Sequence, residues 1–195
     1  MPVRLRQEVQ EVPRSLSRPE PALADDAIRL EPLSEALAPD FDWVVHGDSE
    51  TDRFTLIPSR PDTSFLRTWL GRYERGWDNG SCAGFAIRDG GSGAVIGFAA
   101  FVQLDLEKQQ GEIGYVVDAA ARGRGAARRA VVLLTSWGFT QLRLQLVELR
   151  IDPANEPSAR VAERAGYRRE GTLRSTYFKE GRRSDVDIWA RLAHE

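Results

Sequence analysis

The length and composition of the chain fit one domain with a hydrophobic core, since 42% of its 195 residues are hydrophobic. The 27 basic and 29 acidic residues give a net charge of −2, which argues against a nucleic-acid partner. Cys82 is the only cysteine, so an internal disulfide and a cysteine–histidine metal cluster are excluded, and neither His46 nor His194 is expected to bind a metal. Because no apolar stretch approaches the length of a membrane span and the N-terminus lacks an apolar signal core, we expect a cytoplasmic protein without a membrane partner.

The first part of the chain predicts an extension, a strand and two helical segments. Residues 1–25 contain several prolines and no hydrophobic periodicity, so we expect a flexible extension ahead of a domain at residues 26–195. Alternation over residues 27–33 predicts the first strand. Residues 34–60 fit a helix followed by an irregular loop, and residues 62–77 predict a helix with an inward apolar stripe.

The rest of the chain alternates strands with helices. A glycine-rich turn at residues 89–93 predicts a hairpin, and the apolar residues 113–117 predict a strand that leads into a helix from residue 126. A half-buried strand is expected at residues 147–151, and a helix after it is expected to end at Gly166. With a final hairpin, this order predicts an α/β fold.

The most informative segment is residues 122–127, Arg-Gly-Arg-Gly-Ala-Ala, which joins the strand at 113–117 to the helix that follows. Glycine lets a backbone bend freely and approach a ligand closely. The start of a helix directs unpaired N–H groups and the positive end of its dipole towards one point. This junction therefore predicts a site for a phosphate or pyrophosphate.

The same segment distinguishes between phosphate-binding motifs. A P-loop needs a lysine that is absent here, and a dinucleotide fingerprint needs a small residue where the chain has Arg128. Arg122, Gly125 and Ala127 instead resemble the Arg/Gln-x-x-Gly-x-Gly/Ala signature of the GNAT superfamily of acyl-CoA-dependent N-acyltransferases. The resemblance implies that acetyl-CoA is the cosubstrate and that the strand end and the loop bind it, through Val116, Val117, Arg122, Gly123, Arg124, Gly125, Ala126 and Ala127. Arg128 and Arg129 could contact phosphate or solvent.

A second module resembles the same family. Asn155 and Ser158 match its Asn-x-x-Ser/Ala element, and Gly166-Tyr167 matches the Gly-Phe/Tyr that follows the helix. Asn155 is also a plausible N-cap; the resemblance implies that it and Ser158 contact the cofactor. The tail at residues 168–186 resembles the Rim-type branch, which acetylates protein N-terminal amines. The implied GNAT fold is a mixed, mostly antiparallel twisted sheet, splayed at its central strands, with helices on both faces.

Catalytic candidates follow from the resemblance and from the chemistry of acetyl transfer. Many relatives use a tyrosine acid where this chain has Ala162, so Ser158 is the alternative donor to the leaving sulfur, or else an ordinary first-turn helix residue. Some relatives place a glutamate base where this chain has Tyr177, which leaves Glu112 as the better candidate, unless Glu112 is a solvent-facing strand residue. Tyr177 and Phe178 are expected to wall the acceptor pocket.

When the amine attacks, negative charge develops on the thioester carbonyl oxygen. This oxyanion needs preorganised donors, which we expect to be backbone N–H groups near Val116 to Asp118. No cysteine lies in either module, so direct transfer within a ternary complex is expected. The predicted function is acetyl transfer to a primary amine, with a protein N-terminus favoured. Alternatives are a small-molecule amine, such as an antibiotic or polyamine, and a CoA-binding regulatory domain without turnover. Trp43 and Phe54 could line the acceptor cleft. No metal is expected. A monomer and a homodimer fit the sequence equally.

Overall fold

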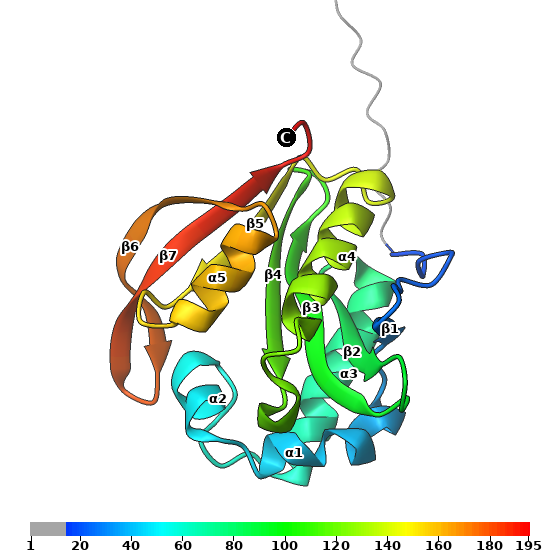
Figure 1. Cartoon of the computed structure of the whole chain (residues 1–195), viewed down its shortest axis with the longest axis vertical. Coiled ribbons are helices and arrows are strands. Elements are labelled where there is room, and N and C mark those ends of the chain that lie inside the picture. The colour runs from blue at the N-terminus through cyan, green and yellow to red at the C-terminus, as the bar shows by residue number, and fades with distance from the viewer. Residues whose placement is uncertain (1–14) are drawn as a thin grey trace, which may run out of the picture.

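An open sheet of seven strands organises residues 15–195, the part of the chain that the computed structural model describes (Figure 1). The strand order is β1-β2-β3-β4-β5-β7-β6, and every neighbouring pair is antiparallel except β4 and β5. This confirms the predicted mixed, mostly antiparallel sheet. The strands are β1 Ile28–Pro32, β2 Ala83–Asp89, β3 Val95–Asp105, β4 Gln110–Val117, β5 Leu146–Ile151, β6 Arg168–Lys179 and β7 Arg182–Leu192.

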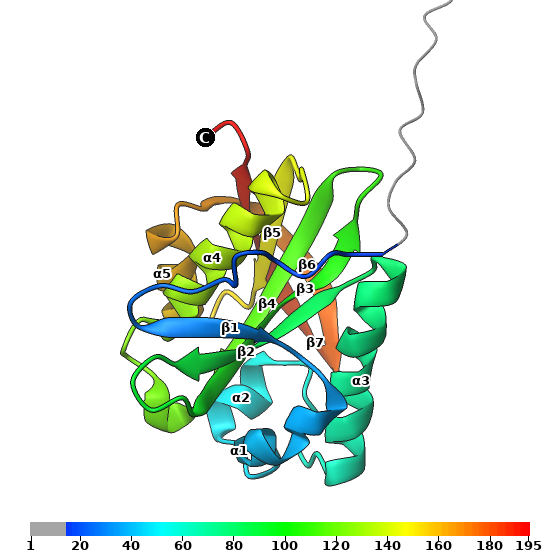
Figure 2. The ribbon, with the colours of Figure 1, turned by 90° about the vertical axis from the view of Figure 1, so that its right-hand side faces the viewer.

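Helices cover both faces of the sheet (Figures 1 and 2). Alternating side chains of the strands feed two separate cores, because successive residues of a strand point to opposite faces. Phe85 packs in the core beneath α4, whereas Ala86 packs in the core beneath α3. The helical segments are η1 Glu35–Phe41, α1 Asp42–Val45, α2 Ser49–Phe54, α3 Thr63–Asn79, η2 Ala119–Ala121, α4 Ala126–Thr140 and α5 Glu156–Arg164.

The sheet splits between β4 and β5, as the resemblance implied. These two parallel strands pair only where residues 110–112 meet residues 146–148. Beyond that point the strands have no registered partners in each other, although β4 runs on to Val117 and β5 to Ile151. The divergence opens a gap at the centre of the sheet, beside the loop that leads into α4.

Two expectations for the first sixty residues are corrected. Residues 15–25 pack along the domain instead of lying outside it: Leu16 is buried, and its N–H donates to the Trp77 carbonyl at 2.7 Å. Residues 1–14 of the predicted extension lie outside the described part. The irregular loop expected before residue 60 contains α2, because Asp48 caps it by accepting from the N–H groups of Glu50 and Thr51.

The helices of residues 15–195 are too short or too polar to cross a membrane.

Candidate active site

A cleft of about 850 Å³ opens where β4 and β5 diverge. The start of α4 and the first turn of α5 line one side of it, and α2, α3 and β6 line the other. Of the residues that the resemblance assigns to catalysis or to the cofactor, all but Arg124 line this cleft. Those that line it are Glu112, Val116, Val117, Arg122, Gly123, Gly125, Ala126, Ala127, Asn155, Ser158 and Tyr177.

The loop before α4 leaves a row of backbone donors without partners. Gly123 and Gly125 have φ values of 79° and 82°, a left-handed conformation that favours glycine. Gly125 caps α4 with no side-chain hydrogen bond, and the first turn closes with the bond from the Arg129 N–H to the Gly125 carbonyl. The N–H groups of the preceding three helical residues therefore have no acceptor within the helix. A Cβ added at either glycine would meet no atom within 4 Å, so the loop surrounds open space that a ligand can enter.

The arginines of this loop point in different directions. The Arg122 side chain bonds to acidic residues of the protein, and Arg124 is exposed outside the cleft. Arg128 lines the cleft, whereas Arg129 pairs with Asp25 and Asp26 away from it. The structure therefore brings Arg128, and not Arg124, towards the site expected for phosphate.

The open edge of β4 presents backbone groups at alternate residues. The Asp118 N–H donates to the Ile96 carbonyl on β3 at 3.0 Å, so the expectation of a free N–H at Asp118 is wrong. Because facing residues of an antiparallel pair alternate, the Val116 backbone also faces β3, whereas Tyr115 and Val117 face the gap. Of the predicted oxyanion segment, only the Val117 N–H is directed into the cleft.

Asn155 and Ser158 begin α5 beside this edge. The Asn155 Oδ1 accepts from the Ser158 N–H at 3.1 Å, which confirms that Asn155 is an N-cap. The Ser158 hydroxyl lies 2.6 Å from the Tyr115 hydroxyl, and either oxygen can donate. Burial raises the pKa of Tyr115 to about 12, while its bond to Ser158 acts in the opposite direction. Tyr115 is therefore protonated at neutral pH and can keep the serine hydroxyl oriented.

Sequence reasoning missed Tyr115. It lies between Ile113 and Val117 on one face of a strand, where an aromatic residue is expected to be part of the core. Only the approach of α5 to β4 shows that its hydroxyl reaches the site.

Glu112 lies in the cleft on the side opposite α5. Its side chain is 23% exposed, and its Oε2 is 3.2 Å from the Arg150 Nε. Burial raises the pKa of Glu112, the Arg150 guanidinium lowers it, and the nearby Glu148 carboxylate raises it further. Tyr177 lines the same region, and its pKa is raised to about 12, mainly by burial and also by the Glu112 carboxylate. Glu112 thus has the partial burial and the raised pKa that suit a proton acceptor.

Apolar side chains line the side of the cleft on which the acceptor is expected. Phe54 lines it as expected, and Trp69 of α3 lines it where Trp43 was considered. Phe178 does not line the cleft and is 57% exposed, so the expectation that it walls the acceptor pocket is wrong. Along β6 the side chains alternate, and Tyr177 takes the inward position.

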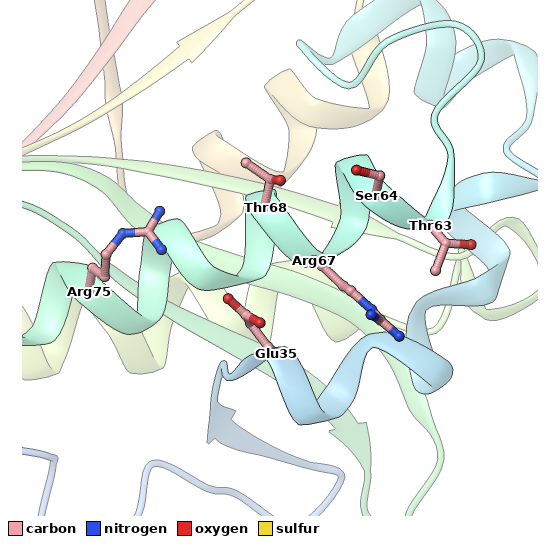
Figure 3. A pocket seen from close by; sticks show the side chains of 6 residues that line it. All are labelled: Glu35, Thr63, Ser64, Arg67, Thr68 and Arg75. Atoms are coloured by element: carbon pink, nitrogen blue, oxygen red, sulfur yellow. The ribbon is translucent and has the colours of Figure 1, made fainter.

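A second hollow, of about 530 Å³, is lined by residues of α3 and by Glu35 of η1 (Figure 3). Its lining is polar, with Glu35 lying between Arg67 and Arg75 in this view. It contains none of the predicted site residues. Within residues 15–195, no cluster of three histidine, cysteine, aspartate or glutamate side chains could hold a metal ion.

The family is decided by a match that covers most of the chain. A family model described as an acetyltransferase (GNAT) domain matches residues 27–168. The chain belongs to the GNAT family. It is an N-acetyltransferase that uses acetyl-CoA as its acetyl donor. The residues around the loop fit this cosubstrate, because the unpaired N–H groups and the open space at Gly123 and Gly125 suit its pyrophosphate.

Similar proteins differ in the acceptors that their names state. An uncharacterised N-acetyltransferase, p20, from Bacillus licheniformis is 30% identical over 76% of this chain and 83% of its own length. A protein named "Putative ribosomal N-acetyltransferase YdaF" from Bacillus subtilis is 29% identical over 73% of this chain and 76% of its own. Spermidine N(1)-acetyltransferase from Escherichia coli is 28% identical, but over only 46% of this chain and 48% of its own.

Among solved structures, a GNAT-family acetyltransferase from Chromobacterium violaceum, described as probable, superposes with a TM-score of 0.79 at 26% identity. The match covers 100% of this chain and 98% of that one.

Proposed function

We propose that this enzyme acetylates a primary amine, with a protein N-terminal α-amine as the preferred acceptor, by direct transfer in a ternary complex. The observation that carries the proposal is the arrangement of the cleft. Open backbone donors lie on its α4 side, and one partly buried carboxylate, Glu112, lies among aromatic side chains on its other side. The two reactants can therefore meet at the open edge of β4.

On the cosubstrate side, we assign the pyrophosphate of acetyl-CoA to the backbone from Gly123 to Ala127. Unpaired N–H groups at a helix start favour an anion. Acetyl-CoA supplies an activated thioester, and in this proposal the Val117 N–H, which faces the gap, donates to its carbonyl oxygen as negative charge develops there. Asn155 begins α5 next to this point and, in this proposal, orients the pantetheine arm.

On the acceptor side, Glu112 accepts the proton that the attacking amine must lose. An α-amine has a pKa of roughly 7.7–8.0, against about 10.4 for lysine, so it needs only modest help from a base near neutrality. Tyr177 forms part of the wall around the acceptor, and its raised pKa keeps it protonated, so it does not act as the base. Ser158, oriented by Tyr115, donates a hydrogen bond to the departing sulfur.

Charge in the cleft favours a singly charged acceptor over a polyamine. Its lining contains six arginines and three acidic residues. Two of those acidic groups, Glu50 and Glu112, are already paired with arginines. A polyamine carries several positive charges and would need carboxylates along the cleft, because like charges at short distance repel. Because one relative is named a spermidine N(1)-acetyltransferase, a polyamine is included among the acceptors to be tested. The charges of this cleft nevertheless suit a polyamine poorly.

The test is a thiol-release assay with acetyl-CoA and three matched acceptors. The first is a lysine-free peptide with a free N-terminus, the second is an N-terminally blocked peptide with one lysine, and the third is spermidine. We expect the free N-terminus to give a kcat/KM at least about tenfold above the other two, or about 1.4 kcal/mol of discrimination. A preference for spermidine or for the blocked peptide would refute the proposed acceptor.

A further inference from the structure

Arg122 uses its whole guanidinium group within the protein. Its Nε donates to the Val117 carbonyl at 3.0 Å. One terminal nitrogen donates to Asp48 and Glu50, at 2.9 Å each, and the other donates to Asp48 at 2.7 Å and to Thr51 at 2.9 Å. A guanidinium has five N–H donors, and these contacts use all of them. The Arg122 side chain thus has no donor left for a phosphate, although a phosphate site lies beside it in our proposal.

These contacts tie the loop before α4 to α2. Asp48 accepts from the N–H groups of Glu50 and Thr51 and so caps this helix. Hydrogen bonds from Arg122 hold the pKa of Asp48 well below its usual range, so the carboxylate stays charged. Arg122 and Asp48 form a bidentate pair. Such a pair is stronger than a single neutral hydrogen bond, because two charge-assisted bonds act together.

The tied helix is a wall of the acceptor side. Glu50, Thr51 and Phe54 line the cleft, and so do residues 55–57 that follow. With six residues, α2 is too short to be stable by itself and depends on tertiary contacts. At its other end, Lys179 pairs with Asp52 at 3.1 Å. The position of this wall therefore depends on anchors at both ends, and the anchor next to the cosubstrate is Arg122.

We propose that Arg122 is a positioning residue that couples the acetyl-CoA site to the acceptor site. The inference rests on the proposed binding of acetyl-CoA to the backbone from Gly123 to Ala127. Binding there restricts the loop that begins at Arg122, and the guanidinium transmits this restriction to the start of α2 and to the Val117 carbonyl. Acetyl-CoA binding thereby orders the acceptor wall, and by linkage acceptor binding strengthens acetyl-CoA binding by the same factor.

The test follows amide hydrogen exchange of the full-length protein with CoA as the probe, so that no acceptor is needed. In the wild type, CoA is expected to slow exchange in the loop at residues 123–127 and, about fivefold or more, in residues 48–57. In Arg122→Gln, CoA still slows the loop but no longer slows residues 48–57. A merely structural arginine would change the exchange rate of α2 without changing its response to CoA.

Three further variants make the result specific. Asp48→Asn keeps an N-cap acceptor but removes the charge, so it should lose the α2 response just as Arg122→Gln does, and the double variant should lose no more. Arg129→Gln is the matched control. Arg129 also pairs with two carboxylates, those of Asp25 at 2.8 Å and Asp26 at 2.6 Å, but it lies outside the cleft. It should keep both responses.

A wild-type loop that responds to CoA without any response in residues 48–57 would overturn the coupling and leave the cofactor site intact. A persistent α2 response in Arg122→Gln would overturn it equally. If CoA slowed neither segment in the wild type, the cofactor placement itself would be wrong, and the coupling with it.

Discussion

Gly125→Ala separates the binding role of the cofactor loop from its conformational strain. Gly125 has φ of 82°, and a Cβ there would meet no protein atom within 4 Å. The substitution therefore costs only the strain of a left-handed non-glycine residue, about 1–2 kcal/mol. For a domain of this size, that lowers the Tm by roughly 2–8 °C. In the complex, the same methyl group occupies the space through which the pyrophosphate approaches, so we expect acetyl-CoA to bind at least about tenfold more weakly.

Gly181 provides a matched control, because its φ is also 82° and its Cβ direction is equally open. It lies in the turn between β6 and β7 and does not line the cleft. Gly181→Ala should lose similar stability by calorimetric unfolding but bind acetyl-CoA like the wild type in titration calorimetry. Equal affinities of Gly125→Ala and the wild type for acetyl-CoA would refute the placement of the pyrophosphate.

Two further predictions concern turnover. Ser158→Ala should lower kcat by about tenfold or more while leaving acetyl-CoA affinity nearly intact. Adding Tyr115→Phe to this variant should lower kcat little further, since the two hydroxyls act as one unit. Strictly additive losses of the two substitutions in steady-state kinetics would contradict this. Glu112→Gln should lower the rate by about 10² or more at pH values above the raised pKa of Glu112 and below the pKa of the amine. In that window the wild-type carboxylate is charged and the amine still has to lose a proton. With an α-amine the defect should shrink towards about pH 9, because the amine is then already neutral, whereas with a lysine acceptor the defect should persist. A pH–rate profile identical to that of the wild type would remove Glu112 from the mechanism.

The cofactor loop was predictable because its signals are local. Glycines at positions 123 and 125, directly before a helical apolar pattern, indicate a left-handed turn and an uncapped helix start. The N-cap at Asn155 and the helix end at Gly166 were predictable for the same reason. In each case the residues that define the structure lie within a few positions of one another, so pattern and propensity suffice.

The contacts that shape the acceptor side were not predictable, because they join distant parts of the chain. Arg122 and Asp48 are 74 residues apart, and Tyr115 and Ser158 are 43 apart. Residues 49–54 carry no apolar stripe, so α2 was expected to be irregular; its cap at Asp48 and its tertiary anchors make it a helix. The same distance explains why Arg122 was expected to contact phosphate: the sequence shows its glycine neighbours and not its carboxylate partners.

The split in the sheet brings both sets of residues to one cleft. Where β4 leaves β5, the backbone groups of Tyr115 and Val117 lose the strand partner that an unbroken sheet would supply. Backbone groups that face the cleft need another partner, because an unpaired buried N–H or carbonyl is costly. The Val117 carbonyl has already found one in Arg122. In the proposed complex, the amide groups of a pantetheine arm and the thioester carbonyl supply the others, and the reacting carbon lies at the end of β4, with Ser158 on one side and Glu112 on the other.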